Sequence, residues 1–104
     1  MTDSDHPLRI EGELTIYRAA ELCEVLKGSL AAVPEHATLG LDLRAVTEMD
    51  SAGAQLLLAA QKSALATGRA LRVSASSAAV DEVLAILRLT TQFTATPPSA
   101  ASTA

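Results

Sequence analysis

The chain has 104 residues, of which 49% are apolar and only 2% aromatic, and its net charge is −4. This length suits one small domain with a single core, and the apolar content excludes a disordered chain. The scarcity of aromatic rings and the scattered positions of the eight basic residues argue against a nucleic-acid-binding protein.

Membrane and secretory classes are also disfavoured. No apolar run reaches the roughly 18 residues that a membrane helix needs, so direct membrane insertion is not expected. Residues 1–7 are polar and acidic, unlike a signal peptide, and are expected to form a flexible N-terminal segment. Cys23 is the single cysteine, which fits a reducing compartment. We therefore expect a cytoplasmic location.

The first expected elements are a strand and a helix. Residues 8–11 alternate apolar and polar side chains, as in a strand. After Gly12-Glu13-Leu14, Thr15 is placed to cap a helix over about residues 16–31. One face of that helix is apolar and consists of Ala19, Leu22, Cys23, Leu26 and Leu30.

A second strand and helix follow. Residues 39–43 alternate leucines with Gly40 and Asp42, which predicts a strand, and a loop is expected after it. Strong helix formers then predict a helix that begins at Ser51, runs to Thr67 and ends at Gly68. Ser51 thus falls in the first turn, where free backbone N–H groups and the positive end of the helix dipole suit a phosphate.

The last part of the chain predicts a third strand and helix. Residues 71–74 form the strand, and Ser76 or Ser77 caps a helix with apolar residues at 80, 83, 84 and 87. Residues 90–93 suggest a short final strand, and residues 94–104 a disordered tail. This alternation predicts one α/β domain over residues 8–93, with a small mixed or parallel sheet and about three main helices packed on it.

Ser51 allows three interpretations: a plain helix cap, a nucleophile or a phosphorylation switch. A nucleophile elbow needs Gly-x-Ser-x-Gly, and Met49 stands where its first glycine belongs. The histidines, His6 and His36, fall in the N-terminal segment and a turn, so no triad base is evident. We therefore expect no enzyme, no catalytic residue, no metal and no cofactor.

The segment 41–53, which ends in Asp50-Ser51-Ala52-Gly53, resembles the STAS family of sulphate-transporter and anti-sigma-factor-antagonist domains. Gly12-Glu13-Leu14 is similar to the family's earlier Gly-Glu-Leu motif, and residues 84–93 to its closing helix and strand. The resemblance covers roughly residues 8–93. Two features depart from the family: Thr15 stands where an acidic residue is common, and residues 1–7 leave little room for the usual opening strand.

The resemblance implies a non-catalytic regulatory protein-binding domain. In the stand-alone antagonists of this family, a kinase that is also the anti-sigma factor phosphorylates the serine after the Asp, and only the unphosphorylated form binds it. By position, Ser51 is the phosphorylation site, and the partner-binding surface consists of Asp50, Ser51, Ala52, Gly53 and Thr15. The implied partner is an anti-sigma factor or serine kinase of the histidine-kinase-like ATPase type.

Alternatives remain for the function and for two of these residues. Small STAS proteins also serve as subunits of phospholipid-transport ABC complexes, bound to the ABC ATPase, and Ser at position 51 tilts the choice toward signalling. A nucleotide-binding module is a third possibility, although no phosphate-binding glycine loop is present. Asp50 can cap the helix, and it can also serve in kinase recognition or help to place the Mg²⁺ of a bound nucleotide. Gly53 can allow close packing within the chain or close approach of a partner.

Overall fold

Strands and helices alternate through the part of the chain that the computed structural model describes, residues 5–94. The predicted tail lies outside the described residues except for Thr94, as do the first four residues of the predicted N-terminal segment. The elements are β1 (Asp5–Leu14), a 3-10 turn η1 (Ile16–Arg18), α1 (Ala19–Ala32), β2 (Thr38–Met49), α2 (Ser51–Ala66), β3 (Ala70–Ser76), α3 (Ala78–Ile86) and α4 (Thr90–Thr94).

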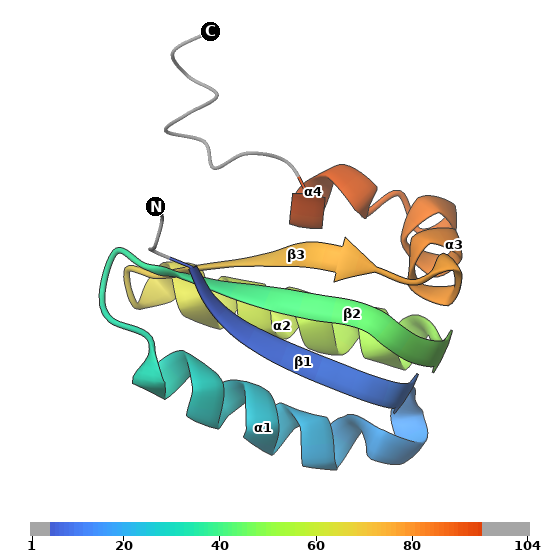
Figure 1. Ribbon diagram of the computed structural model, residues 1–104, viewed down its shortest axis with the longest axis horizontal. Coiled ribbons are helices and arrows are strands. Elements are labelled where there is room, and N and C mark those ends of the chain that lie inside the picture. Colours follow the sequence, from blue (N-terminus) through green and yellow to red (C-terminus); the bar gives the residue numbers. More distant parts are fainter. Residues whose placement is uncertain (1–4, 95–104) are drawn as a thin grey trace, which may run out of the picture.

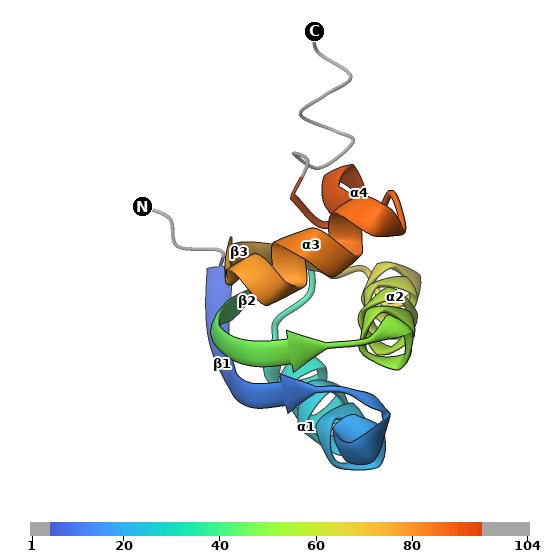
Figure 2. The same cartoon turned by 90° about the vertical axis from the view of Figure 1, so that its right-hand side faces the viewer.

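The three strands form one sheet in the order β1-β2-β3, and both pairs are parallel (Figure 1). The α/β class is confirmed, and within residues 5–94 the sheet is wholly parallel. Helices α1 and α2 cover one face of the sheet (Figure 2), as right-handed connections between successive strands require. No described helix covers the other face. Helix α3 lies beside the carboxyl-terminal part of β2, and α4 packs against β3.

The core is almost entirely aliphatic and lies between the sheet and the two helices α1 and α2. The leucines that predicted the second strand all point into it, together with one face of each helix. Its central members are Leu39, Leu41, Leu43, Leu22, Leu26, Leu30, Leu57, Ala60 and Ala64. The predicted apolar face of the first helix is thus confirmed at its three leucines.

Two strands are longer than the alternation of side chains predicted. Strand β1 extends from Asp5 to Leu14. Strand β2 continues to Met49, so the prediction of a loop directly after Leu43 is wrong. The pairing of β1 with β2 shifts register twice, once between Arg9 and Glu11 and once between Gly12 and Glu13. Each shift adds a residue to β2 and interrupts the alternation of its side chains between the two faces of the sheet. The second half of the strand therefore lacks the period-two pattern by which a strand is recognised in the sequence.

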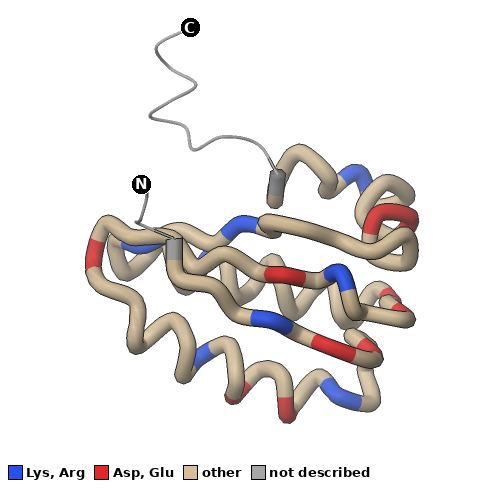
Figure 3. Tube along the Cα trace, viewed as in Figure 1, with Lys and Arg blue, Asp and Glu red and all other residues tan. Residues whose placement is uncertain are grey.

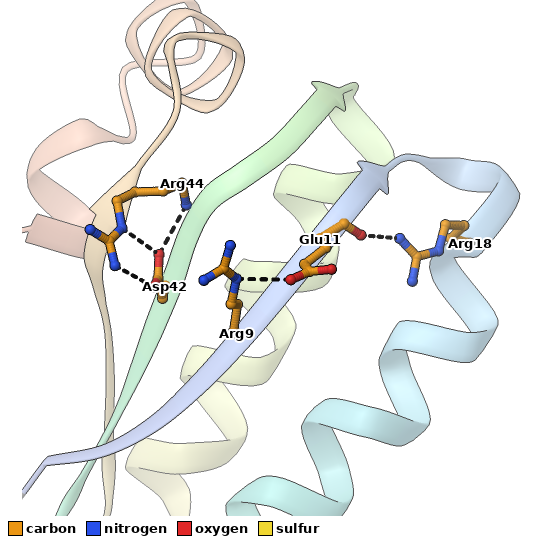
Figure 4. Close-up of polar contacts among 5 residues, drawn as sticks. All are labelled: Arg9, Glu11, Arg18, Asp42 and Arg44. Atoms are coloured by element: carbon orange, nitrogen blue, oxygen red, sulfur yellow. Dashed lines mark hydrogen bonds and ion pairs between the residues drawn. The ribbon is translucent and has the colours of Figure 1, made fainter.

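The first helix begins differently from the prediction. The side chain of Thr15 makes no capping hydrogen bond; its hydroxyl donates to Glu13 Oε1 at 3.2 Å. The chain instead makes the 3-10 turn η1 before α1. The Arg18 guanidinium fixes this turn to β1 by donating to the backbone carbonyls of Glu11 and Glu13 (the Glu11 contact is shown in Figure 4).

The predicted final strand at residues 90–93 is wrong, because these residues belong to α4. Phe93 is completely buried, and Gln61 Nε2 donates to the backbone carbonyl of Gln92 at 2.9 Å. Gln92 Nε2 donates in return to Gln61 Oε1 at 3.0 Å. The two threonines favour a strand by propensity, but burial of the ring and this amide pair outweigh such a weak local preference.

Candidate functional site

Asp50 caps helix α2 and ties it to the turn after β1. Its Oδ1 accepts from the backbone N–H of Gly53 at 2.9 Å, and its Oδ2 from that of Ile16 at 3.1 Å. These bonds stabilise the carboxylate, so the pKa of Asp50 lies below its usual value, with the Gly53 bond as the largest cause. Asp50 therefore joins two segments that are far apart in the sequence.

Gly53 is buried where α2 crosses the end of β1. A Cβ atom built on Gly53 would lie 2.1 Å from the carbonyl oxygen of Leu14. No side chain fits in that space, so the chain itself requires a glycine here. Of the two explanations that the sequence left open, close packing within the chain accounts for this residue.

Ser51 is the first residue of α2 and is exposed. Its hydroxyl makes no hydrogen bond with any other described residue, because Asp50 already fills the capping role. The two histidines lie at the opposite end of the sheet: His6 pairs with Leu39 at the start of two strands, and His36 precedes β2. The arrangement thus offers a free hydroxyl at a helix start without a neighbouring histidine.

The structure brings the predicted partner-binding residues together around the carboxyl end of β1, but it exposes them unequally. Ser51 is exposed and Asp50 and Ala52 are half-buried, whereas Gly53 and Thr15 are buried. Thr15 lies directly before Ile16, whose N–H binds Asp50. Of these five residues, Ser51 is therefore the most accessible to a partner.

An open groove of about 510 Å³ lies beside Asp50, between the ends of β1 and β2 and the start of α3. Its lining includes four acidic residues, Glu13, Glu48, Asp50 and Glu82, and none of its described lining residues is Lys, Arg or His. Figure 3 shows acidic residues near this edge of the molecule. No local sequence pattern marks this groove, because its walls come from three segments that only the fold brings together.

The described residues give no sign of a metal centre or a membrane span. No three of their His, Cys, Asp and Glu side chains gather closely enough to hold a metal ion, despite the acidic groove. Among helices α1 to α4, none combines the length and the apolar character needed to cross a bilayer.

Comparison with known proteins gives a family and a fold. A family model described as "Mlab, STAS domain" matches residues 1–95. None of the curated proteins matches the chain.

Several solved structures resemble it, among them the following two. The anti-sigma factor antagonist SpoIIAA in its unphosphorylated form is 19% identical, with a TM-score of 0.67 over 94% of this chain and 84% of that one. A sulfate transporter family protein from Wolinella succinogenes is 22% identical, with a TM-score of 0.65 over 86% of this chain and 70% of that one. At these identities the likeness establishes a shared fold. Together with the family model, it shows that the chain belongs to the STAS domain family.

Proposed function

We propose that this chain is a non-catalytic regulatory protein-binding domain of the anti-sigma-factor-antagonist type, switched by phosphorylation of Ser51. The partner is a serine kinase of the histidine-kinase-like ATPase type that also acts as an anti-sigma factor. The observation that carries the proposal is the exposed Ser51 hydroxyl at the start of α2, which the fold does not use because Asp50 caps the helix. The location is the cytoplasm.

The fold tolerates a phosphate at this position. Phosphorylation adds roughly −1.5 to −2 charges at neutral pH. A helix N-terminus stabilises such a charge by about 0.3–1 kcal/mol, and the neighbouring Asp50 carboxylate offsets part of that gain. Because the Ser51 side chain packs against nothing that must move, the modified chain keeps its structure.

A bound partner does not tolerate the phosphate. Ser51 and Ala52 are small, so a partner can approach the helix start closely. An unpaired charge trapped in such an interface commonly costs several kcal/mol. A loss of about 3 kcal/mol corresponds to more than a hundredfold in affinity. One modification therefore ends binding without unfolding the domain.

The test compares affinity and stability on the same samples. Incubation with the kinase and ATP, followed by phosphopeptide mapping, should place the phosphate on Ser51. Ser51→Asp should weaken binding of the kinase, with up to the hundredfold loss expected of phosphate, while Ser51→Ala should bind as the unmodified chain does. Neither substitution should change the free energy of unfolding, measured by urea melts, by more than about 1 kcal/mol.

Ser77 supplies the matched control, since it also stands at a helix start. Its hydroxyl accepts from the backbone N–H of Val80 at 3.3 Å and so caps α3. Ser77→Ala should cost about 1 kcal/mol of stability and leave kinase binding unchanged. Phosphate on Ser77 with Ser51 unmodified, or equal kinase affinity for Ser51→Asp and the unmodified chain, would remove the switch.

A second candidate is a subunit of a phospholipid-transport ABC complex, bound to its ATPase. The description of the matching family model, which names Mlab, favours it. In this role the Ser51 surface binds the ATPase without phosphorylation. Tight binding to an ABC ATPase subunit, together with no phosphate on Ser51 after kinase treatment, would select this candidate over the first.

A further inference from the structure

The turn after β1 leaves two large apolar side chains in solvent. Tyr17 is 89% exposed and Ile16 is 63% exposed. The chain has only two aromatic residues, and the other, Phe93, is completely buried. Exposed tyrosines are enriched at the centres of protein interfaces, where they add a large contact area for a small loss of conformational freedom.

The backbone that carries these two side chains is fixed in place. The N–H of Ile16 is bound to Asp50 at 3.1 Å, and the N–H of Arg18 donates to the carbonyl of Thr15 at 3.0 Å. The Arg18 guanidinium also binds the carboxylate of Glu21. An apolar surface that is already ordered loses less entropy when a partner binds than a mobile one does.

The charge of the adjoining groove limits which partner fits. Tyr17 lines the groove together with Glu13, Glu48, Asp50 and Glu82, without a basic residue among the described lining. A symmetric pair of these chains would set the same carboxylates against each other, which disfavours a second copy as the occupant. A cationic rim on a different protein would meet complementary charge.

We propose that Ile16, Tyr17 and this groove form a docking surface for a partner protein whose contact region is apolar at its centre and carries arginine or lysine at its rim. The inference rests on the proposed function only in that this function supplies a protein partner. The groove shares Thr15 and Asp50 with the predicted partner-binding residues, whereas Ser51 does not line it.

The probe is a short synthetic peptide amide of two leucines flanked by arginines, titrated into the isotope-labelled chain and followed by NMR. The amide signals of Ile16, Tyr17 and Glu48 should shift. Tyr17→Ser should weaken binding about tenfold, an effect typical of an interface tyrosine. Glu82→Gln should also weaken binding of the peptide, because it removes one of the carboxylates that attract the peptide's arginines. Added salt should weaken binding too, because it screens this attraction.

Leu65 offers the matched control variant, since it is 61% exposed but lies near the far end of α2. Leu65→Ser should leave the affinity for the peptide unchanged. The same peptide with glutamates in place of arginines should not bind. Equal affinities for Tyr17→Ser and the unmodified chain, equal binding of the acidic peptide, or no shift at the groove would each overturn the inference.

The experiment also separates this inference from the proposed function. Ser51→Asp adds a negative charge outside the groove, so it should not lower the affinity for the cationic peptide. Peptide binding that depends on Tyr17, combined with kinase binding that is insensitive to Ser51→Asp, would support the docking surface and reject the switch.

Discussion

The open face of the sheet and the groove at its carboxyl end are both polar and exposed, yet their charges are organised in opposite ways. On the open face, Arg9 pairs with Glu11 at 2.9 Å and Arg44 with Asp42 at 2.9 Å (Figure 4). In the groove, acidic side chains gather without a basic residue among the described lining. The charges of these two pairs on the open face offset each other, whereas the described lining of the groove carries an excess of one sign.

This difference separates a solvated surface from one that suits a partner. Exposed ion pairs contribute little to stability, but the two charges within each pair offset each other and so attract other charged molecules only weakly. Unbalanced charge opposes compaction through self-repulsion and attracts molecules of the opposite sign over long distances. The two regions can therefore be told apart by substitutions that act on one and not on the other.

The largest effect on stability should come from Gly53→Ala, which disrupts the close contact between the start of α2 and the end of β1 beside the groove. The new Cβ would clash with the Leu14 carbonyl at 2.1 Å, so we expect a loss of roughly 3 kcal/mol in the free energy of unfolding. Gly28→Ala is the control, because nothing lies within 4 Å of its added Cβ on the exposed face of α1. It should gain about 0.5–1 kcal/mol. Equal effects of the two substitutions in urea melts would contradict the close approach.

A smaller loss should follow from Asp50→Ala, which removes the capping bond to the Gly53 N–H and the bond to the Ile16 N–H that joins α2 to the turn after β1. Asp50→Asn keeps one oxygen for the Gly53 N–H, and its loss of stability should be smaller. Because the folded pKa of Asp50 is depressed, its contribution is present above the unfolded value and is lost as the pH falls through the folded value. The difference in stability between the unmodified chain and Asp50→Asn should therefore narrow in melts at about pH 3. If the difference in stability between the two chains were the same at about pH 3 as at neutral pH, the charge of Asp50 would not be what stabilises the fold.

The smallest effect on the fold should come from the open face. The guanidinium of Arg44 lowers the pKa of Asp42 from its ordinary 3.8 to about 2, mainly through their side-chain hydrogen bond. Arg44→Gln should move that pKa back toward 3.8 in an NMR titration. The contribution of the pair is present above the ordinary value and is lost as the pH falls through about 2. Arg44→Gln should leave the affinity for the cationic peptide unchanged. A marked loss of affinity would show that the open face takes part in binding the peptide.

The sequence predicted those parts of the fold that depend on local pattern. The leucines of β2, a serine cap for α3 and the end of α2 at Gly68, which has a φ of +77°, all follow from short-range rules. Of the two serines that the sequence offered as the cap, Ser77 is the one that the structure uses. The bulges in β2 and the helix α4 do not, because they depend on pairing with β1 and on the contact between Gln61 and Gln92.

The site divides in the same way. Asp50 and Ser51 could be placed at a helix start from the residues around them. The exposure of Tyr17 could not be predicted, because a tyrosine early in an amphipathic segment is as compatible with burial as with solvent. The groove required the ends of β1 and β2 to meet α3, which only the tertiary structure supplies.

The close contact between Leu14 and Gly53 makes the end of β1 and the start of α2 behave as one rigid piece. Under the proposed switch, a phosphate on Ser51 would therefore act through the charge and shape that it adds to the surface, because there is no hinge at this point for it to move. Such a switch would need no slow conformational change. Its speed would be set by how fast the partner associates and dissociates. Hydrolysis of the phosphate would restore the original surface at once, with nothing left to refold.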